Sequence, residues 1–68
     1  MTRRMIALTR KTVDDVRTLF LNPALVTAVE ITDDYDTLVH VAGGHVFLVE
    51  EGATDVVDKI ERAEEGAL

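Results

Sequence analysis

A chain of 68 residues has room for one small domain, which buries roughly 60% of the surface that its unfolded form exposes. Its net charge of −6 repels nucleic-acid phosphates and anionic lipid headgroups, and the lack of cysteine excludes disulfides and thiolate metal sites. Because 47% of the residues are hydrophobic, we expect the chain to fold, with a partner subunit or a metal as its remaining source of extra stability.

The sequence carries no sign of membrane insertion or export. No apolar run approaches the roughly 20 residues that cross a bilayer, and residues 1–10 lack the apolar stretch of a signal peptide. The absence of cysteine is typical of a reducing compartment. We therefore expect a cytoplasmic protein, or part of a large assembly that is built in the cytoplasm.

The first half of the chain predicts strands separated by turns. Residues 5–9 form a short apolar run of strand length. Residues 12–21 fit two structures. Thr12, with Asp15 three positions on, resembles a helix capping box that has Asp in place of Glu, whereas residues 17–21 are typical of a strand and end at a turn signal. Residues 22–24 then predict a turn around Pro23.

A second strand-like segment, residues 25–32, is rich in β-branched side chains. In a regular strand Val26, Ala28 and Glu30 face one way, and the residues between them face the other. Residues 33–36 read as a polar loop. Its three aspartates lack the glycine and the closing glutamate of an EF-hand calcium loop, so we interpret it as a solvated turn.

Residues 37–50 give the clearest hairpin, with two strands joined by Gly43 and Gly44. A two-residue loop pairs Ala42 with His45. This register predicts that His40, His45 and Phe47 share one face with Leu38, Ala42 and Val49, and that the other face carries Val39, Val41, Val46 and Leu48. Since both faces are largely apolar, we expect both to be covered, by the rest of the chain or by a neighbour.

Residues 53–65 predict a helix, which has an apolar stripe of Val56, Val57, Ile60 and Ala63. The predicted fold class is therefore α+β: a small antiparallel sheet of four or five strands, open or partly curled into a barrel, with a C-terminal helix packed on it. We expect a single domain over residues 1–68, with a flexible N-terminal end at 1–4, the sheet within 5–50 and the helix at 53–65.

Few side chains in this sequence could bind a metal ion or catalyse a reaction. His40 and His45 are diagonal neighbours in the predicted register, but zinc needs three or four ligands, so we interpret both imidazoles as edge groups. The chain has no serine, no cysteine and no glycine-rich phosphate loop. We predict no enzymatic activity, no metal and no cofactor.

Apolar and turn residues along nearly the whole chain form a recognisable series. Its segments are Met5-Ile6-x-Leu8-Thr9-Arg10, Phe20-Leu21-Asn22-Pro23-x-Leu25-Val26, Val29-Glu30-x-Thr32, Thr37-Leu38-Val39, Gly44 ahead of Val46, Val49-Glu50-Glu51 and Val56-Val57-Asp58-Lys59-Ile60. This series resembles the FlbD family of small flagellar proteins. The resemblance implies a non-enzymatic role in flagellar assembly or motor function, and a strand over residues 17–21.

The resemblance also implies where this chain differs. Members of the family join their first two strands by a short Asn-Gly-type turn, whereas residues 11–15 form a longer connection here. We expect the tip of that connection, residues 12–15, to make a contact of its own. Two alternatives remain: a small structural subunit of a phage particle, and an RNA-binding regulator similar to the carbon storage regulators, which the acidic charge disfavours.

The surplus of apolar strand surface over what one helix can cover predicts association with a protein partner or with further copies of the chain. We expect no nucleic-acid partner, no membrane insertion and no small-molecule substrate. The expected contact lies on the 37–50 hairpin, with Phe47 as its anchor, and on the first loop. The residues assigned to it are Val39, Val41, His45, Val46, Phe47, Leu48, Asp14 and Asp15.

Overall fold

The computed structural model describes residues 5–66, which form five strands, one short 3-10 helix and one α-helix. The predicted flexible end at residues 1–4 lies outside this range. The elements in chain order are β1 (Ile6–Lys11), β2 (Val16–Leu21), η1 (Pro23–Leu25), β3 (Val26–Ile31), β4 (Thr37–Val41), β5 (His45–Val49) and α1 (Ala53–Gly66).

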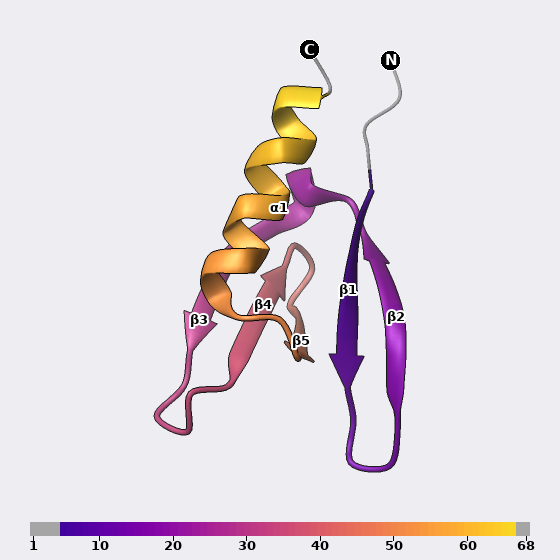
Figure 1. Ribbon diagram of the computed structural model, residues 1–68, viewed down its shortest axis with the longest axis vertical. Coiled ribbons are helices and arrows are strands. Elements are labelled where there is room, and N and C mark those ends of the chain that lie inside the picture. The colour runs from indigo at the N-terminus through magenta and orange to yellow at the C-terminus, as the bar shows by residue number, and fades with distance from the viewer. Residues whose placement is uncertain (1–4, 67–68) are drawn as a thin grey trace.

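All five strands belong to one open antiparallel sheet in the order β2-β1-β5-β4-β3, so β2 and β3 are its two edges. The predicted α+β class is confirmed, and the sheet does not close into a barrel. A single residue pair, Arg10 and Val49, joins β1 to β5. The β1–β2 hairpin therefore stands beside the rest of the sheet as a separate limb, and α1 packs against both β3 and β1 (Figure 1).

The ambiguous segment after β1 is a strand. All six residues of β2 pair with β1, from Lys11 and Val16 at the loop to Ile6 and Leu21 at the far end. Thr12 closes the loop, because its N–H and its Oγ1 both donate to the carbonyl oxygen of Asp15 at 2.9 Å. The spacing of Thr12 and Asp15 thus closes a four-residue hairpin loop and begins no helix.

The predicted turn before β3 is present as η1, where the Oδ1 of Asn22 accepts a hydrogen bond from the N–H of Ala24 at 3.0 Å. A register shift between Val26 and Ala28 then interrupts the pairing of β3 with β4. Val26 consequently packs toward the core with Val29. The prediction that Val26 and Ala28 face the same way was wrong, because a bulge changes the alternation of side chains.

The β4–β5 hairpin is present, but its predicted register was wrong by one residue. Val41, rather than Ala42, pairs with His45, and Val39 pairs with Phe47. Ala42 joins the two glycines in a three-residue loop, where its N–H donates to the carbonyl oxygen of Leu25 at 2.8 Å. The shift matters because a one-residue slip moves every side chain of a strand to the other face.

Both loop glycines adopt left-handed conformations, with φ of 95° at Gly43 and 84° at Gly44. No atom lies within 4 Å of a Cβ placed on Gly44, so alanine there meets backbone strain alone. We expect Gly44→Ala to lower the free energy of unfolding by about 1 kcal/mol, measured by urea denaturation. A variant with unchanged stability would contradict the left-handed conformation.

One apolar core lies between the sheet and α1. Its buried members come from the β1–β2 hairpin, from the β4–β5 hairpin and from the helix: Ile6, Leu8, Leu21, Val39, Val41, Val49, Val56 and Ala63. Ile60 is half-buried against this core. Val57, which we predicted to pack on the sheet, is 41% exposed and lies beside Val29 and Ile31 of β3.

Candidate protein-interaction surfaces

The hairpin residues predicted to contact a partner divide between the two faces of the sheet. Val39 and Val41 are 0% and 9% exposed in the core, so they offer no surface to a partner. Val46 and Leu48 point to the opposite face, as do Leu38 and His40. There Val46 is 49% exposed and Leu48 is half-buried. We call the four side chains Leu38, His40, Val46 and Leu48 the outer face.

Phe47, the predicted anchor, points to the core side, where it is half-buried. The ring of His45 lies parallel to it, with 6.5 Å between centroids, and the guanidinium carbon of Arg10 lies 5.2 Å from the Phe47 centroid. A cation above an aromatic face is attracted to the ring electrons. This contact helps to hold β1 against β5 beside their single paired position.

The two histidines point to opposite faces of the hairpin, because His40 pairs with Val46 and His45 pairs with Val41. The prediction that they share a face was wrong for the same reason as the register. The Nε2 atom of His40 lies 2.9 Å from Oε1 of Glu30 on the neighbouring strand. Within residues 5–66, no three His, Cys, Asp or Glu side chains group closely enough to hold a metal ion.

In the β1–β2 loop, Asp15 has a structural role. Its carboxylate accepts a hydrogen bond from Arg17 Nε at 3.0 Å and one from the N–H of Val16 at 2.8 Å. The Arg17 bond first, and then the Val16 bond, hold the pKa of Asp15 below its ordinary value. Asp14 is exposed, and the neighbouring Val13 is 100% exposed at the tip.

A polar junction joins β1 to the segment between β5 and α1. The carboxylate of Glu51 accepts hydrogen bonds from the N–H of Thr9 at 2.9 Å and from its Oγ1 at 3.1 Å. Lys59 Nζ lies 4.0 Å from the same carboxylate and donates to the carbonyl oxygen of Ala7 at 2.8 Å. Sequence reasoning missed this junction, since Glu51 and Lys59 are each more than 40 residues from their partners on β1.

Burial and hydrogen bonding shift the pKa of Glu51 in opposite directions. Partial burial raises the pKa of its carboxyl, but the hydrogen bonds from Thr9 and the nearby charge of Lys59 outweigh that effect and hold the pKa below its ordinary value. The carboxylate is therefore the stable form in the folded protein.

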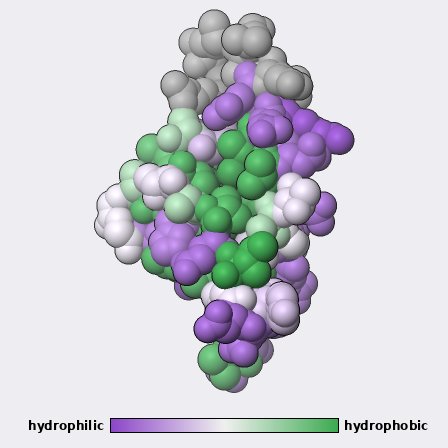
Figure 2. Space-filling model, turned by 90° about the vertical axis from the view of Figure 1, so that its left-hand side faces the viewer, coloured by the Kyte–Doolittle hydropathy of each residue, from purple (hydrophilic) through white to green (hydrophobic). Residues whose placement is uncertain are grey.

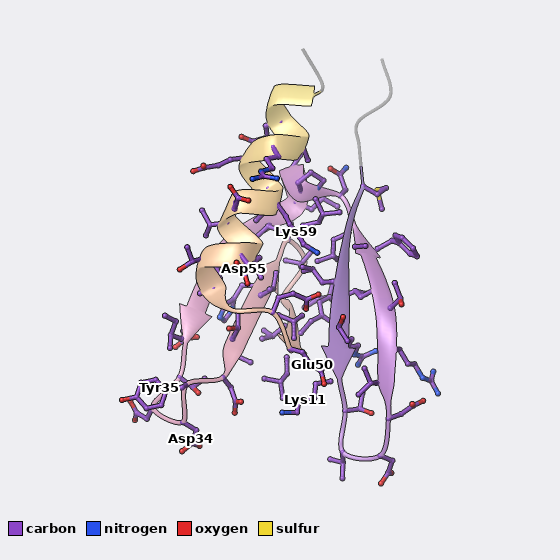
Figure 3. The ribbon with its side chains drawn as sticks, in the orientation of Figure 1. Lys11, Asp34, Tyr35, Glu50, Asp55 and Lys59 are labelled. Carbon is purple, nitrogen blue, oxygen red and sulfur yellow. The ribbon has the colours of Figure 1, made fainter. Side chains whose placement is uncertain are left out.

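An open polar hollow lies at the lower end of the molecule, below the start of α1. It has a volume of about 400 Å³ and is lined by Lys11, Tyr35, Asp36, Thr37, Val49, Glu50 and Gly52. Figure 3 shows Lys11 and Glu50 close together there, with Asp34 and Tyr35 out on the β3–β4 loop. Small-molecule sites are usually enclosed and mostly apolar, so this hollow is a poor candidate for one.

A second hollow is a shallow apolar groove between β3 and α1, with a volume of about 420 Å³. We call it the edge groove, and it is lined by Val29, Ile31, Ala53, Thr54 and Val57. Ile31 is 62% exposed. Apolar side chains gather over the middle of this side of the molecule, with hydrophilic ones above and below (Figure 2). Sequence reasoning missed the groove because it assigned Val57 to the core.

Comparison with known proteins identifies the family of this chain. Residues 5–66 match FlbD, described as flagellar and swarming motility proteins. The chain belongs to the FlbD family. The match runs from the residue before β1 to the end of α1, so it includes all five strands and the helix. No curated protein and no solved structure gave a match.

FlbD membership confirms the resemblance drawn from the sequence and ties the chain to flagellar or swarming motility. The family's description names a cellular process and no reaction. Within the described residues, α1 is too short and too polar to cross a membrane.

Proposed function

We propose that this FlbD protein is a non-enzymatic accessory factor of flagellar or swarming motility, which acts in the cytoplasm by binding another protein of the motility apparatus. The observation that carries the proposal is the apolar outer face of the β4–β5 hairpin. α1 packs on the opposite face of the sheet, and Val46 on the outer face is 49% exposed.

The outer face has the composition of a contact surface. Leu38, Val46 and Leu48 supply apolar area, while His40 and its partner Glu30 supply polar groups at the margin. Large contiguous apolar patches on a monomer mark sites of protein association. A different protein is favoured over a second copy, because each copy carries a net charge of −6.

We expect Val46→Asp to reduce swimming or swarming at least tenfold in a strain that carries the variant gene, because a carboxylate within the contact must be desolvated on binding. Colony spreading on soft agar measures the effect, and circular dichroism of the purified variant tests its fold. Val16→Asp is the matched control, since Val16 is 52% exposed on the distant strand β2 and pairs with Lys11.

Two results would overturn the proposal. Full motility with a folded Val46→Asp protein would remove the outer face as the contact, and full motility after deletion of the gene would remove the role itself. Light scattering at several concentrations separates the two kinds of partner. A dimeric wild type that becomes monomeric in Val46→Asp would replace the foreign partner with a second copy.

A further inference from the structure

We propose that the open edge of β3 binds an extended segment of a partner protein as a sixth strand, and that this segment is apolar at its centre and carries Lys or Arg at both ends. The inference rests on the proposed function, association with another protein, and assigns a second contact to a surface separate from the outer face. The edge, the groove beside it and the charges around it each support part of this proposal.

β3 presents main-chain groups that can accept another strand. It pairs only with β4 in the sheet of the described chain. The N–H of Thr32 donates to the carbonyl oxygen of Asp36, so these two residues form a hydrogen-bonded pair. Along an antiparallel ladder, hydrogen-bonded pairs alternate with pairs whose main-chain groups point away from the neighbouring strand. The main-chain groups of Val29 and Ile31 therefore point to the open edge, where an added strand would pair with them.

The edge groove lies beside the same two residues. The side chains of Val29 and Ile31 form one wall, and Ala53, Thr54 and Val57 of α1 form the other. Alternate side chains of an added strand point to the same face as Val29 and Ile31. They would cover Ile31 and Val57, which are 62% and 41% exposed in the free protein. The groove thus selects apolar residues at the centre of the bound segment.

Exposed acidic residues follow both walls of the groove along the chain. Asp33 and Asp34 follow Ile31 at the lower end, and both are exposed. At the upper end, helical spacing places Glu61 and Glu64 on the same side of α1 as Ala53 and Val57, and both glutamates are exposed. The two basic residues of α1 have other partners: Lys59 donates to the carbonyl oxygen of Ala7 on β1, and Arg62 pairs with Asp58 at 3.0 Å.

This distribution of charge defines the partner. A segment with Lys or Arg at each end meets carboxylates at both ends of the groove. A second copy of this chain does not fit. Antiparallel pairing of two β3 edges would bring the aspartates of each copy to the glutamates of the other, and parallel pairing would bring like groups together.

The test uses a displayed library of random peptides of roughly ten residues, the upper range of strand length, selected on the full-length protein. We expect enriched sequences with alternating apolar residues and Lys or Arg at both ends. Binding of the selected peptides should fall at least tenfold with Ile31→Lys and should persist with Val46→Lys, the matched control on the outer face. In NMR spectra, the peptides should shift the amides of β3 and the first half of α1.

Failure to enrich any peptide, enrichment without basic ends, or equal binding to Ile31→Lys would each overturn the proposal. These outcomes are separate from the proposed function, which depends on the motility of Val46→Asp. A strain that loses motility with Val46→Asp and retains it with Ile31→Lys would keep the accessory role and remove the edge site. Spectral shifts confined to the outer face would do the same.

Discussion

Replacing Leu8 with alanine is expected to unfold most of the protein at room temperature. Leu8 is 1% exposed, and it lies on β1, which a single residue pair joins to β5. Apolar packing, more than main-chain pairing, must therefore hold the β1–β2 limb to the rest of the molecule. A buried Leu→Ala change costs about 2–5 kcal/mol, whereas a domain of this size is stable by only about 3–5 kcal/mol.

Circular dichroism during urea and thermal denaturation measures this effect. Leu25→Ala is the matched control, because Leu25 is 48% exposed and only its main chain bonds to Ala42. We expect the control to lose less than about 1 kcal/mol. If the two variants unfolded at the same urea concentration, the core contact of Leu8 would be wrong.

Replacing Glu51 with glutamine is expected to lower the free energy of unfolding by about 1.5–3 kcal/mol at pH 7, the range for hydrogen bonds to charged groups. The side chain of Glu51 is 19% exposed, and both of its oxygens accept from the N–H of Thr9. An amide keeps one of these oxygens and turns an N–H₂ group toward the other position. It also removes the charge beside Lys59.

The same change should reduce the acid sensitivity of the protein. The pKa of Glu51 is lower in the folded chain than the ordinary glutamate value of about 4.3. Below that value the unfolded chain binds more protons than the folded chain, so acid favours unfolding. The contribution of Glu51 is complete above the unfolded pKa and is lost as pH falls through the folded pKa. The stability gap between wild type and Glu51→Gln should therefore narrow from pH 7 to pH 3.

Urea denaturation at a series of pH values tests both statements. Glu50→Gln makes the same change at the adjacent, exposed residue, and we expect it to alter stability by less than about 0.5 kcal/mol. Asp15 titrates in the same range in both variants, so its effect cancels from the comparison. A gap that stays constant with pH would show that the Glu51 carboxylate does not make these bonds.

An error of one residue in the register of the β4–β5 hairpin changed which side chains were assigned to the candidate contact. Val46 and Leu48 share one face of the hairpin, as the sequence predicted, but Val39 and Val41 exchange places with Leu38 and His40. Two adjacent glycines allow a loop of two residues or of three, and each choice leaves both faces apolar. The longer loop buries two valines and sets an N–H of the loop against Leu25. No local pattern contains that information.

The sequence by itself determined the elements whose causes are local. Asn22 and Pro23 make a turn, two glycines make a hairpin loop, and the apolar spacing after Gly52 makes a helix. The backbone preferences of a few neighbouring residues are enough to produce the turn, the loop and the helix. The same residues, with the family resemblance, predicted an α+β chain related to FlbD proteins.

Only the tertiary structure decided which side chains are buried, paired or open to a partner. It resolved residues 16–21 as a strand through pairing with β1, joined Glu51 to Thr9, and left Ile31 and Val57 beside an open edge. Each of these outcomes depends on contacts between segments that are distant in sequence. Burial is a property of the assembled layers, and so the surfaces available for binding follow from the fold rather than from any short stretch of residues.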